Sequence, residues 1–206
     1  MPMILPAFVL SYLIGSIPTA YIFARALKGV DIRTFGSGNV GATNAMRLLG
    51  KRAGITVLVL DVLKGFAAVT VVGGWACASP GRIEPETLRL LLGLTCILGH
   101  SYTVFLRFRG GKGVAASLGV LAGLAFGSAS LRVVLMAVLA VWVIVFLFSR
   151  LVSLSSIIAA CAFPVSAVIL RQPRSLIVAS IALCIFVVVR HKSNIQRLFK
   201  GTEKRL

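Results

Sequence analysis

The chain has 206 residues, and its composition excludes an ordinary soluble domain. Hydrophobic residues make up 58% of it, charged residues only 13%, and the mean hydropathy is +1.00, whereas soluble domains average roughly 45–50% apolar and about 25% charged residues. Its 22 Lys and Arg residues outnumber five Asp and Glu, but they lie between long apolar runs, which indicates a membrane protein and not a nucleic-acid-binding one.

Seven apolar stretches are long enough to be considered as membrane spans, since a bilayer core needs about 20 apolar residues per helix. In chain order they cover residues 4–24, 53–76, 88–106, 114–129, 133–149, 151–170 and 175–189. The fourth is short and carries Gly119, Gly123 and Gly127, so we expect it to pack closely against a neighbouring helix. The sequence predicts an all-α membrane protein with about seven transmembrane helices, forming a single integral-membrane domain over residues 1–206.

The basic residues predict how these helices are oriented. With seven spans, sixteen Lys and Arg residues fall on one side of the membrane and five on the other, while Lys64 lies inside a span. Because basic residues concentrate in cytoplasmic segments, we expect the N-terminus outside and the C-terminus in the cytoplasm. The three segments with unusual polar chemistry then all lie on the cytoplasmic side.

The first of these segments is a glycine-rich loop with many hydrogen-bond donors. Ser37, Asn39, Thr43 and Asn44 lie among glycines, and Arg47 follows them. Such a loop is consistent with a simple polar turn, or with a site for an anion or a polyol.

The second segment contains His100 and the loop Gly110-Gly111-Lys112-Gly113, directly before an apolar stretch. Glycines allow backbone N–H groups to turn toward an anion, a helix N-terminus attracts negative charge, and lysine adds a point charge for a phosphate. The loop is not a Walker A motif, because no Ser or Thr follows Lys112. The alternative is a basic hairpin that contacts lipid headgroups.

The third segment carries His191, Asn194 and Arg197 and continues to Glu203. Taken alone, it is typical of a basic tail next to the membrane that binds anionic lipid. Asp61 and Lys64 lie three residues apart inside the second apolar stretch. Ionisable residues at membrane depth indicate function, although mutual pairing as a structural clamp explains this pair equally well.

Several reaction classes are excluded by what the chain lacks. Two histidines and five carboxylates are too few for a metal hydrolase, and the nucleophile elbow of a Ser–His–Asp hydrolase does not occur. We expect no metal and no cofactor. Two phosphate-capable loops with few bases suit transfer between two phosphate-bearing partners, one of them lipidic, by positioning and charge.

The three segments together resemble the motifs of the PlsY family, the bacterial acyl-phosphate:glycerol-3-phosphate acyltransferases. The resemblance rests on residues 37–47, on residues 99–115 and on residues 191–203, in matching order and spacing. It implies transfer of a fatty acyl group from acyl phosphate to the 1-hydroxyl of sn-glycerol 3-phosphate, giving lysophosphatidic acid and phosphate. It also implies a bacterial cytoplasmic membrane, an active site facing the cytoplasm, and an upstream enzyme that forms acyl phosphate.

The resemblance assigns roles to individual residues. The residues that it predicts to be catalytic are Ser37, Arg47, Lys112, His191 and Asn194. Those that it predicts to bind substrate are Asn39, Thr43, Asn44, His100, Gly110, Gly111, Gly113, Arg197 and Glu203. In the family, the amides of Gly110, Gly111 and Gly113 would hold the phosphate of the acyl phosphate.

The identity of the general base stays open at this point. His191 is one candidate for deprotonating the glycerol hydroxyl, and a substrate phosphate is the other. We favour the substrate phosphate, with His191 as an orienting group. The rival function is a small anion or phosphate-ester transporter, but transporters typically show repeats and midplane polar residues.

Overall fold

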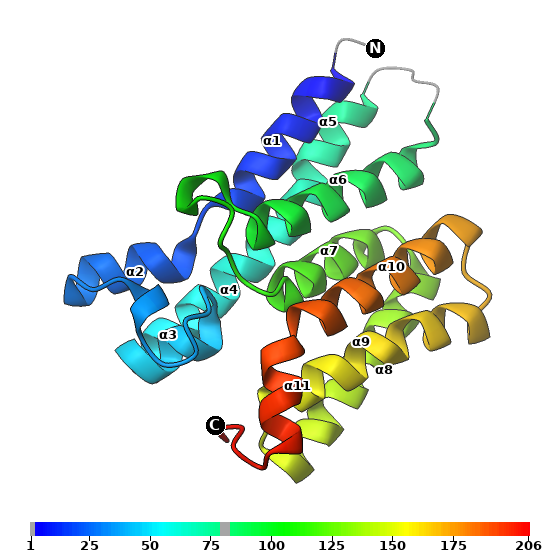
Figure 1. Cartoon of the computed structure of the whole chain (residues 1–206). Coiled ribbons are helices and arrows are strands. Elements are labelled where there is room, and N and C mark those ends of the chain that lie inside the picture. The colour runs from blue at the N-terminus through cyan, green and yellow to red at the C-terminus, as the bar shows by residue number, and fades with distance from the viewer. Residues whose placement is uncertain (1–2, 79–82) are drawn as a thin grey trace. The chain divides into compact units, whose positions relative to one another are not determined.

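The computed structural model describes residues 3–78 and 83–206, and within these ranges its regular elements are all helical (Figure 1). The α-helices are α1 (Ile4–Ser16), α2 (Thr19–Lys28), α3 (Ala42–Leu49), α4 (Lys51–Ala67), α5 (Gly73–Cys77), α6 (Pro85–Ser101), α7 (Val114–Phe126), α8 (Ala129–Ser149), α9 (Val152–Ile169), α10 (Arg174–Arg190) and α11 (Lys192–Phe199). Short 3-10 turns cover η1 (Ile32–Thr34) and η3 (Val104–Leu106), and a π-helical segment, η2 (Ala68–Val72), joins α4 to α5. The chain divides into two compact units, Met1–Leu124 and Ala125–Leu206.

Five helical segments in the described part of the chain are long and apolar enough to cross a membrane. They are Ile4–Lys28, Lys51–Cys77, Pro85–Leu106, Ala129–Ser149 and Val152–Ile169. The pair α10 and α11, bent by 60°, adds a sixth if it counts as one span. An all-helical membrane protein with five or six candidate spans is therefore confirmed.

The predicted fourth span differs most from expectation. Its helix, α7, has 13 residues, which gives about 20 Å of length, short of the roughly 30 Å of a bilayer core. Gly113 takes a left-handed backbone conformation before it, and the helix ends near Gly127. Apolar composition alone did not reveal where this helix stops. Arg82, which the orientation argument counts on the outer side, lies outside the described residues.

Glycines explain how the helices of the first unit pack. A Cβ on Gly119 would collide with the backbone oxygen of Val62 in α4, and one on Gly123 would lie 2.9 Å from the Cβ of Val69. The predicted close packing of the fourth stretch is thus confirmed for these two glycines. A Cβ on Gly127 would meet nothing within 4 Å, so this glycine takes no part in the packing.

The first span is not one straight helix. α1 ends at Ser16 and α2 begins at Thr19, because Pro18 has no N–H to continue the helical ladder. α1 packs along α6 (Figure 1), where Ser11 Oγ donates to the Leu92 carbonyl at 2.6 Å. The break places Ile17 and Thr19 beside polar groups of α4.

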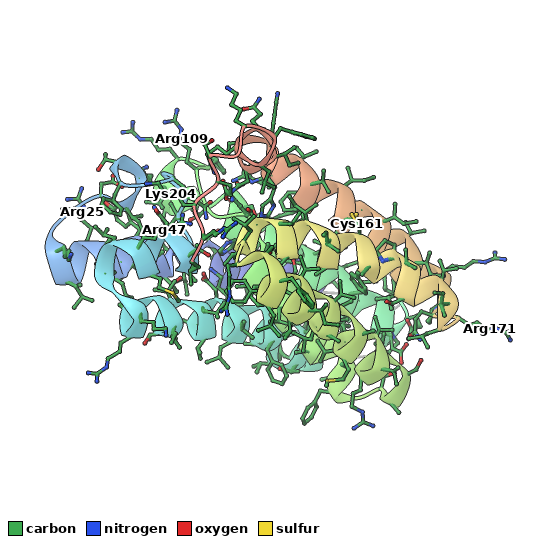
Figure 2. All side chains as sticks on the ribbon, turned by 90° about the horizontal axis from the view of Figure 1, so that it is seen from below. Arg25, Arg47, Arg109, Cys161, Arg171 and Lys204 are labelled. Atoms are coloured by element: carbon green, nitrogen blue, oxygen red, sulfur yellow. The ribbon has the colours of Figure 1, made fainter. Side chains whose placement is uncertain are left out.

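In the second unit, α9 packs against both α8 and α10. Trp142 Nε1 of α8 donates to Ser156 Oγ of α9 at 3.3 Å. Arg171 and Lys204 lie at opposite ends of this unit (Figure 2). The helices of this unit therefore run between one end that carries Arg171 and another that carries Lys204.

Candidate functional site

The first polar segment is a loop organised by its own side chains. Asp31 accepts hydrogen bonds from the backbone N–H and the guanidinium of Arg33, the shortest at 2.6 Å from Nη2. This guanidinium holds the pKa of Asp31 at about 2. The loop therefore begins from an ionised carboxylate paired with arginine.

Asn44 fixes the other half of this loop. Its Nδ2 donates to the carbonyls of Ile32 and Phe35 at 3.2 and 3.0 Å, and its Oδ1 accepts from the Ser37 N–H at 3.3 Å. Asn44 is 1% exposed, and a Cβ on Gly36, which has a φ of +60°, would lie 2.5 Å from its Oδ1. These contacts show that Asn44 shapes the loop, and its expected binding of substrate stays a prediction.

The remaining residues of the first segment have more accessible side chains. Ser37 is exposed, whereas Asn39, Thr43 and Arg47 are half-buried. Arg47 lies in the last turn of α3, where the helix carbonyls favour a cation. Figure 2 places Arg25, Arg47 and Arg109 toward the end of the first unit that holds α2 and α3.

The second polar segment packs directly against the first. A Cβ on Gly111 would lie 2.8 Å from the Val40 carbonyl and would collide with the imidazole Nε2 of His100. The structure therefore brings the loop of residues 36–44, His100 and the glycine loop of residues 110–113 together in one unit, as the motifs suggested.

Two of the four glycine-loop residues use their amides within the protein. The Gly110 N–H donates to the Ser101 carbonyl and the Gly111 N–H to the His100 carbonyl, both at 3.1 Å. These bonds attach the loop to the end of α6. Gly110 and Gly111 were expected to hold a phosphate through these amides; the hydrogen bonds show that they fix the loop, and a contact with phosphate stays a prediction.

The N-terminus of α7 follows immediately and offers the donors that the glycines do not. Gly113 has a φ of +85°, and its carbonyl accepts from the Ser117 N–H at 2.8 Å and from Ser117 Oγ at 2.7 Å. The first amides of an α-helix have no intrahelical partner, and they attract anions. Lys112 adds its charge one residue earlier, so this helix end is suited to a phosphate.

Asp61 and Lys64 form an ion pair, with Nζ and Oδ1 2.8 Å apart. Asp61 Oδ1 also accepts from Thr19 Oγ1 at 2.7 Å, and Lys64 Nζ donates to the Ile17 carbonyl at 3.0 Å. The clamp expected as one of two explanations is therefore present. It closes on the break between α1 and α2.

The third polar segment belongs to the second unit. Glu203 Oε1 accepts from Ser153 Oγ at 2.8 Å and from Asn194 Nδ2 at 2.6 Å, and Oε2 accepts from Arg197 Nε at 2.6 Å. Burial raises the pKa of Glu203, but these three donors outweigh it and lower the pKa overall. Glu203 and Arg197 were expected to bind substrate, and their contacts here fold the tail back onto α9 and α11.

His191 lies at the 60° bend between α10 and α11 and is 2% exposed. Its Nδ1 is 2.8 Å from the Val187 carbonyl. Because a carbonyl oxygen only accepts hydrogen bonds, Nδ1 carries a proton, and Nε2 is the nitrogen that can gain or lose one. The spacing of His191 and Asn194 is confirmed as one turn, with the Asn194 N–H bonded to the His191 carbonyl at 2.9 Å.

Sequence reasoning missed two residues that organise these sites. Thr19 was hidden in an apolar stretch, although Pro18 beside it signals a break in the helix. Ser153 carried no signal, because its contact with Glu203 joins residues far apart in the chain. Among the described residues, no group of three or more His, Cys, Asp or Glu side chains is arranged to hold a metal ion.

Comparisons with known proteins show the family of this chain. A family model described as glycerol-3-phosphate acyltransferase matches residues 5–201. The glycerol-3-phosphate acyltransferase of Trichormus variabilis is 43% identical, with 96% of this chain and 89% of the relative covered. That of Rippkaea orientalis is 45% identical, with 96% and 90% covered.

Solved structures of PlsY, an integral membrane glycerol 3-phosphate acyltransferase, have the same fold. The glycerol 3-phosphate form is 38% identical with a TM-score of 0.85, and the lysophosphatidic acid form is 37% identical with a TM-score of 0.82. Each alignment covers 98% of this chain and 95% of the solved chain. The resemblance drawn from three short motifs is thereby confirmed over nearly the whole length, and the chain belongs to the PlsY family of integral membrane glycerol-3-phosphate acyltransferases.

Proposed function

We propose that this acyltransferase transfers a fatty acyl group from acyl phosphate to the 1-hydroxyl of sn-glycerol 3-phosphate. The hydroxyl oxygen bonds to the acyl carbon, the bond from that carbon to the phosphate oxygen breaks, and the hydroxyl proton leaves with inorganic phosphate. The products are lysophosphatidic acid and phosphate. The PlsY structures with glycerol 3-phosphate and lysophosphatidic acid support these as substrate and product.

The observation that carries the proposal is the packing of Gly111 against both His100 and Val40. This packing brings together, in one unit, two elements that are suited to bind anions. One is the loop of residues 36–44 with Arg47, and the other is Lys112 next to the N-terminus of α7. Acyl phosphate has a good leaving group, so positioned donors that stabilise the developing oxyanion suffice, without a covalent enzyme intermediate.

The contacts refine which residues would meet substrate. In this proposal, the residues that contact substrate are Ser37, Arg47, Lys112, Gly113, His191 and Asn194. Asn39 and Thr43 are accessory donors. A second set of residues supports the substrate-contacting ones by holding loops and helices in place. It comprises Asn44, Gly110, Gly111, Arg197 and Glu203. His100 belongs with this second set, because its ring packs on Gly111.

In this proposal, a substrate phosphate accepts the proton of the glycerol hydroxyl. Four of the five acidic side chains already hold groups of the protein: Asp31, Asp61, Glu84 and Glu203. This supports a mechanism without a carboxylate base. His191, held at Nδ1 by the Val187 carbonyl, then orients a substrate through Nε2.

We further propose that the chain lies in a bacterial cytoplasmic membrane with the site facing the cytoplasm, the N-terminus outside and the C-terminus inside. Seven crossings require the short α7 to traverse a locally thinned region or a protein-lined one. The opposite placement of Arg171 and Lys204 in the second unit supports opposite faces for the two (Figure 2). Acyl phosphate would come from an upstream enzyme that makes it.

This orientation is tested by single cysteines in a variant with the four native cysteines replaced. Both Arg171 and Lys204 are exposed. In right-side-out spheroplasts, an impermeant maleimide should label Arg171→Cys at once and Lys204→Cys only after the membrane is opened. The reverse pattern would contradict the proposed orientation.

The reaction is tested with purified protein in lipid, without added metal or nucleotide. Palmitoyl phosphate and palmitoyl-CoA are supplied in parallel, each with glycerol 3-phosphate, and both phosphate release and lysophosphatidic acid are measured. We expect turnover with palmitoyl phosphate that requires both substrates. Turnover with the CoA ester alone would refute the donor. Phosphate release without lysophosphatidic acid would refute acyl transfer.

A further inference from the structure

A buried polar cluster lies at the break in the first span, away from the residues that the proposed reaction uses directly. Thr19, Asp61, Lys64 and His100 belong to it, and each is at most 8% exposed. They come from three elements, α2, α4 and α6. Burying charged groups at membrane depth costs free energy, so we expect these residues to have a specific role.

Part of that task is to complete the broken helix. Lys64 donates to the Ile17 carbonyl at the C-terminal end of α1, and Asp61 accepts from Thr19 at the N-terminal end of α2. A helix carries partial negative charge at its C-terminus and partial positive charge at its N-terminus. The ion pair therefore presents each charge to the helix end of opposite sign.

This clamp leaves out His100. The Nδ1 atom of His100 lies 3.7 Å from Asp61 Oδ1, which is too far for a hydrogen bond but close enough for the ring and the carboxylate to interact electrostatically. The Nε2 edge of the same ring packs on Gly111, with no room for a Cβ between them. The ring of His100 thus lies between Asp61 and the glycine loop.

The backbone of α6 also connects His100 to the glycine loop. The carbonyls of His100 and Ser101 accept the amides of Gly111 and Gly110. Gly111 therefore contacts both the backbone and the ring of His100, and Lys112 follows Gly111 directly.

We propose that Asp61 is a positioning residue for the glycine loop of residues 110–113, which it holds in place through the ring of His100. The role rests on the proposed function in one respect, namely that Lys112 and the start of α7 bind a substrate phosphate. The contacts of Lys64 and Thr19 serve the helix break, whereas the contact between Asp61 and His100 serves the loop.

Hydrogen exchange of the backbone amides tests this without any need for turnover. In Asp61→Asn, a peptide covering residues 108–113 should exchange about tenfold faster than in the wild type, because local opening no longer meets the same resistance. Thr19→Val is the matched control, since it removes a hydrogen bond to the same Oδ1 atom and leaves the charge that faces His100. Its loop peptide should exchange at the wild-type rate.

Because Asp61→Asn leaves Lys64 buried without its partner and can fail to fold, the double variant Asp61→Asn/Lys64→Gln is measured as well. Unchanged loop exchange in a folded variant, or equal acceleration in Thr19→Val, would overturn the proposal. Acceleration confined to the charge-removing variants supports it.

Kinetics provide the second readout. In the charge-removing variants, the KM for at least one phosphate-bearing substrate should rise about tenfold while kcat stays within about threefold, the pattern of lost binding. Thr19→Val should keep both values. A fall in kcat at constant KM would contradict the proposal. Absence of wild-type turnover with acyl phosphate would refute the proposed function, and the exchange experiment would still decide the role of Asp61.

Discussion

The two units of this protein use a carboxylate in different ways. In the first unit, Asp61 lies inside a membrane span, 1% exposed, and meets a lysine, a hydroxyl and an imidazole. In the second, Glu203 comes from the tail after the last helix and accepts hydrogen bonds from Ser153, Asn194 and Arg197.

The difference shows how a chain with five acidic residues organises two polar sites. The first unit shapes its anion-suited loops by glycine contacts and a buried charge, so the donors that would meet substrate lie on backbone and basic side chains. The second unit folds its tail around one carboxylate and so orients an amide next to His191. Neither carboxylate is left over for proton transfer.

The largest effect should come from removing the basic side chains of the first unit. Arg47→Ala and Lys112→Met should each lower kcat/KM by about 100- to 1000-fold, the usual loss when a positioned charge or donor is removed. Initial rates of phosphate release at several concentrations of each substrate measure this. Lys51→Ala, an exposed residue at the start of α4, is the matched control and should keep wild-type rates. Normal rates in Arg47→Ala would exclude it from the site.

Breaking the cluster of the second unit should mainly affect stability. Glu203→Gln removes the charge that Arg197, Asn194 and Ser153 share, and it should lower the free energy of unfolding by about 1.5–3 kcal/mol, as for hydrogen bonds to a charged group. Thermal unfolding in detergent measures it. Glu86→Gln, an exposed position in the first turn of α6, should have little effect. Equal shifts for both would mean that the Glu203 contacts contribute nothing.

The close packing of α7 against α4 can be tested with a pair of glycine substitutions. Gly119→Ala directs a methyl group at the backbone of Val62, so it should destabilise by about 1–3 kcal/mol, the usual effect of overpacking. Gly127→Ala meets nothing within 4 Å and should be close to neutral. The two unfolding temperatures measured side by side decide this, and identical values would argue against close contact of α7 with α4.

Acid should produce the smallest of these effects. The folded-state pKa of Glu203 is lowered from its ordinary value of 4.5, so its stabilising contribution is complete above that value and is lost as pH falls through the folded pKa. Unfolding temperatures of the wild type and Glu203→Gln should therefore converge as the pH falls through the lowered pKa of Glu203. A constant difference down to pH 3 would show that the carboxylate does not titrate with folding.

Sequence patterns correctly predicted an all-helical membrane protein and its family, because hydropathy and motif spacing are local properties. They also predicted a seventh full span where α7 has only 13 residues. They did not predict the contacts that Asn44, Gly110 and Glu203 make within the protein, since a motif gives a residue's position and not its hydrogen-bond partners. The break at Pro18 was visible in principle. The attachment of Lys64 to the Ile17 carbonyl depends on how α4 packs beside α1 and α2, which local patterns do not encode.

The central claim, that a substrate phosphate takes the proton while His191 orients a substrate, is tested most directly by the pH dependence of kcat/KM in His191→Ala. We predict that KM rises and that the profile keeps the same ionisations as the wild type. A variant with unchanged KM, a lower kcat and the loss of an ionisation near 6.5, the ordinary pKa of imidazole, would identify His191 as the base and contradict the claim.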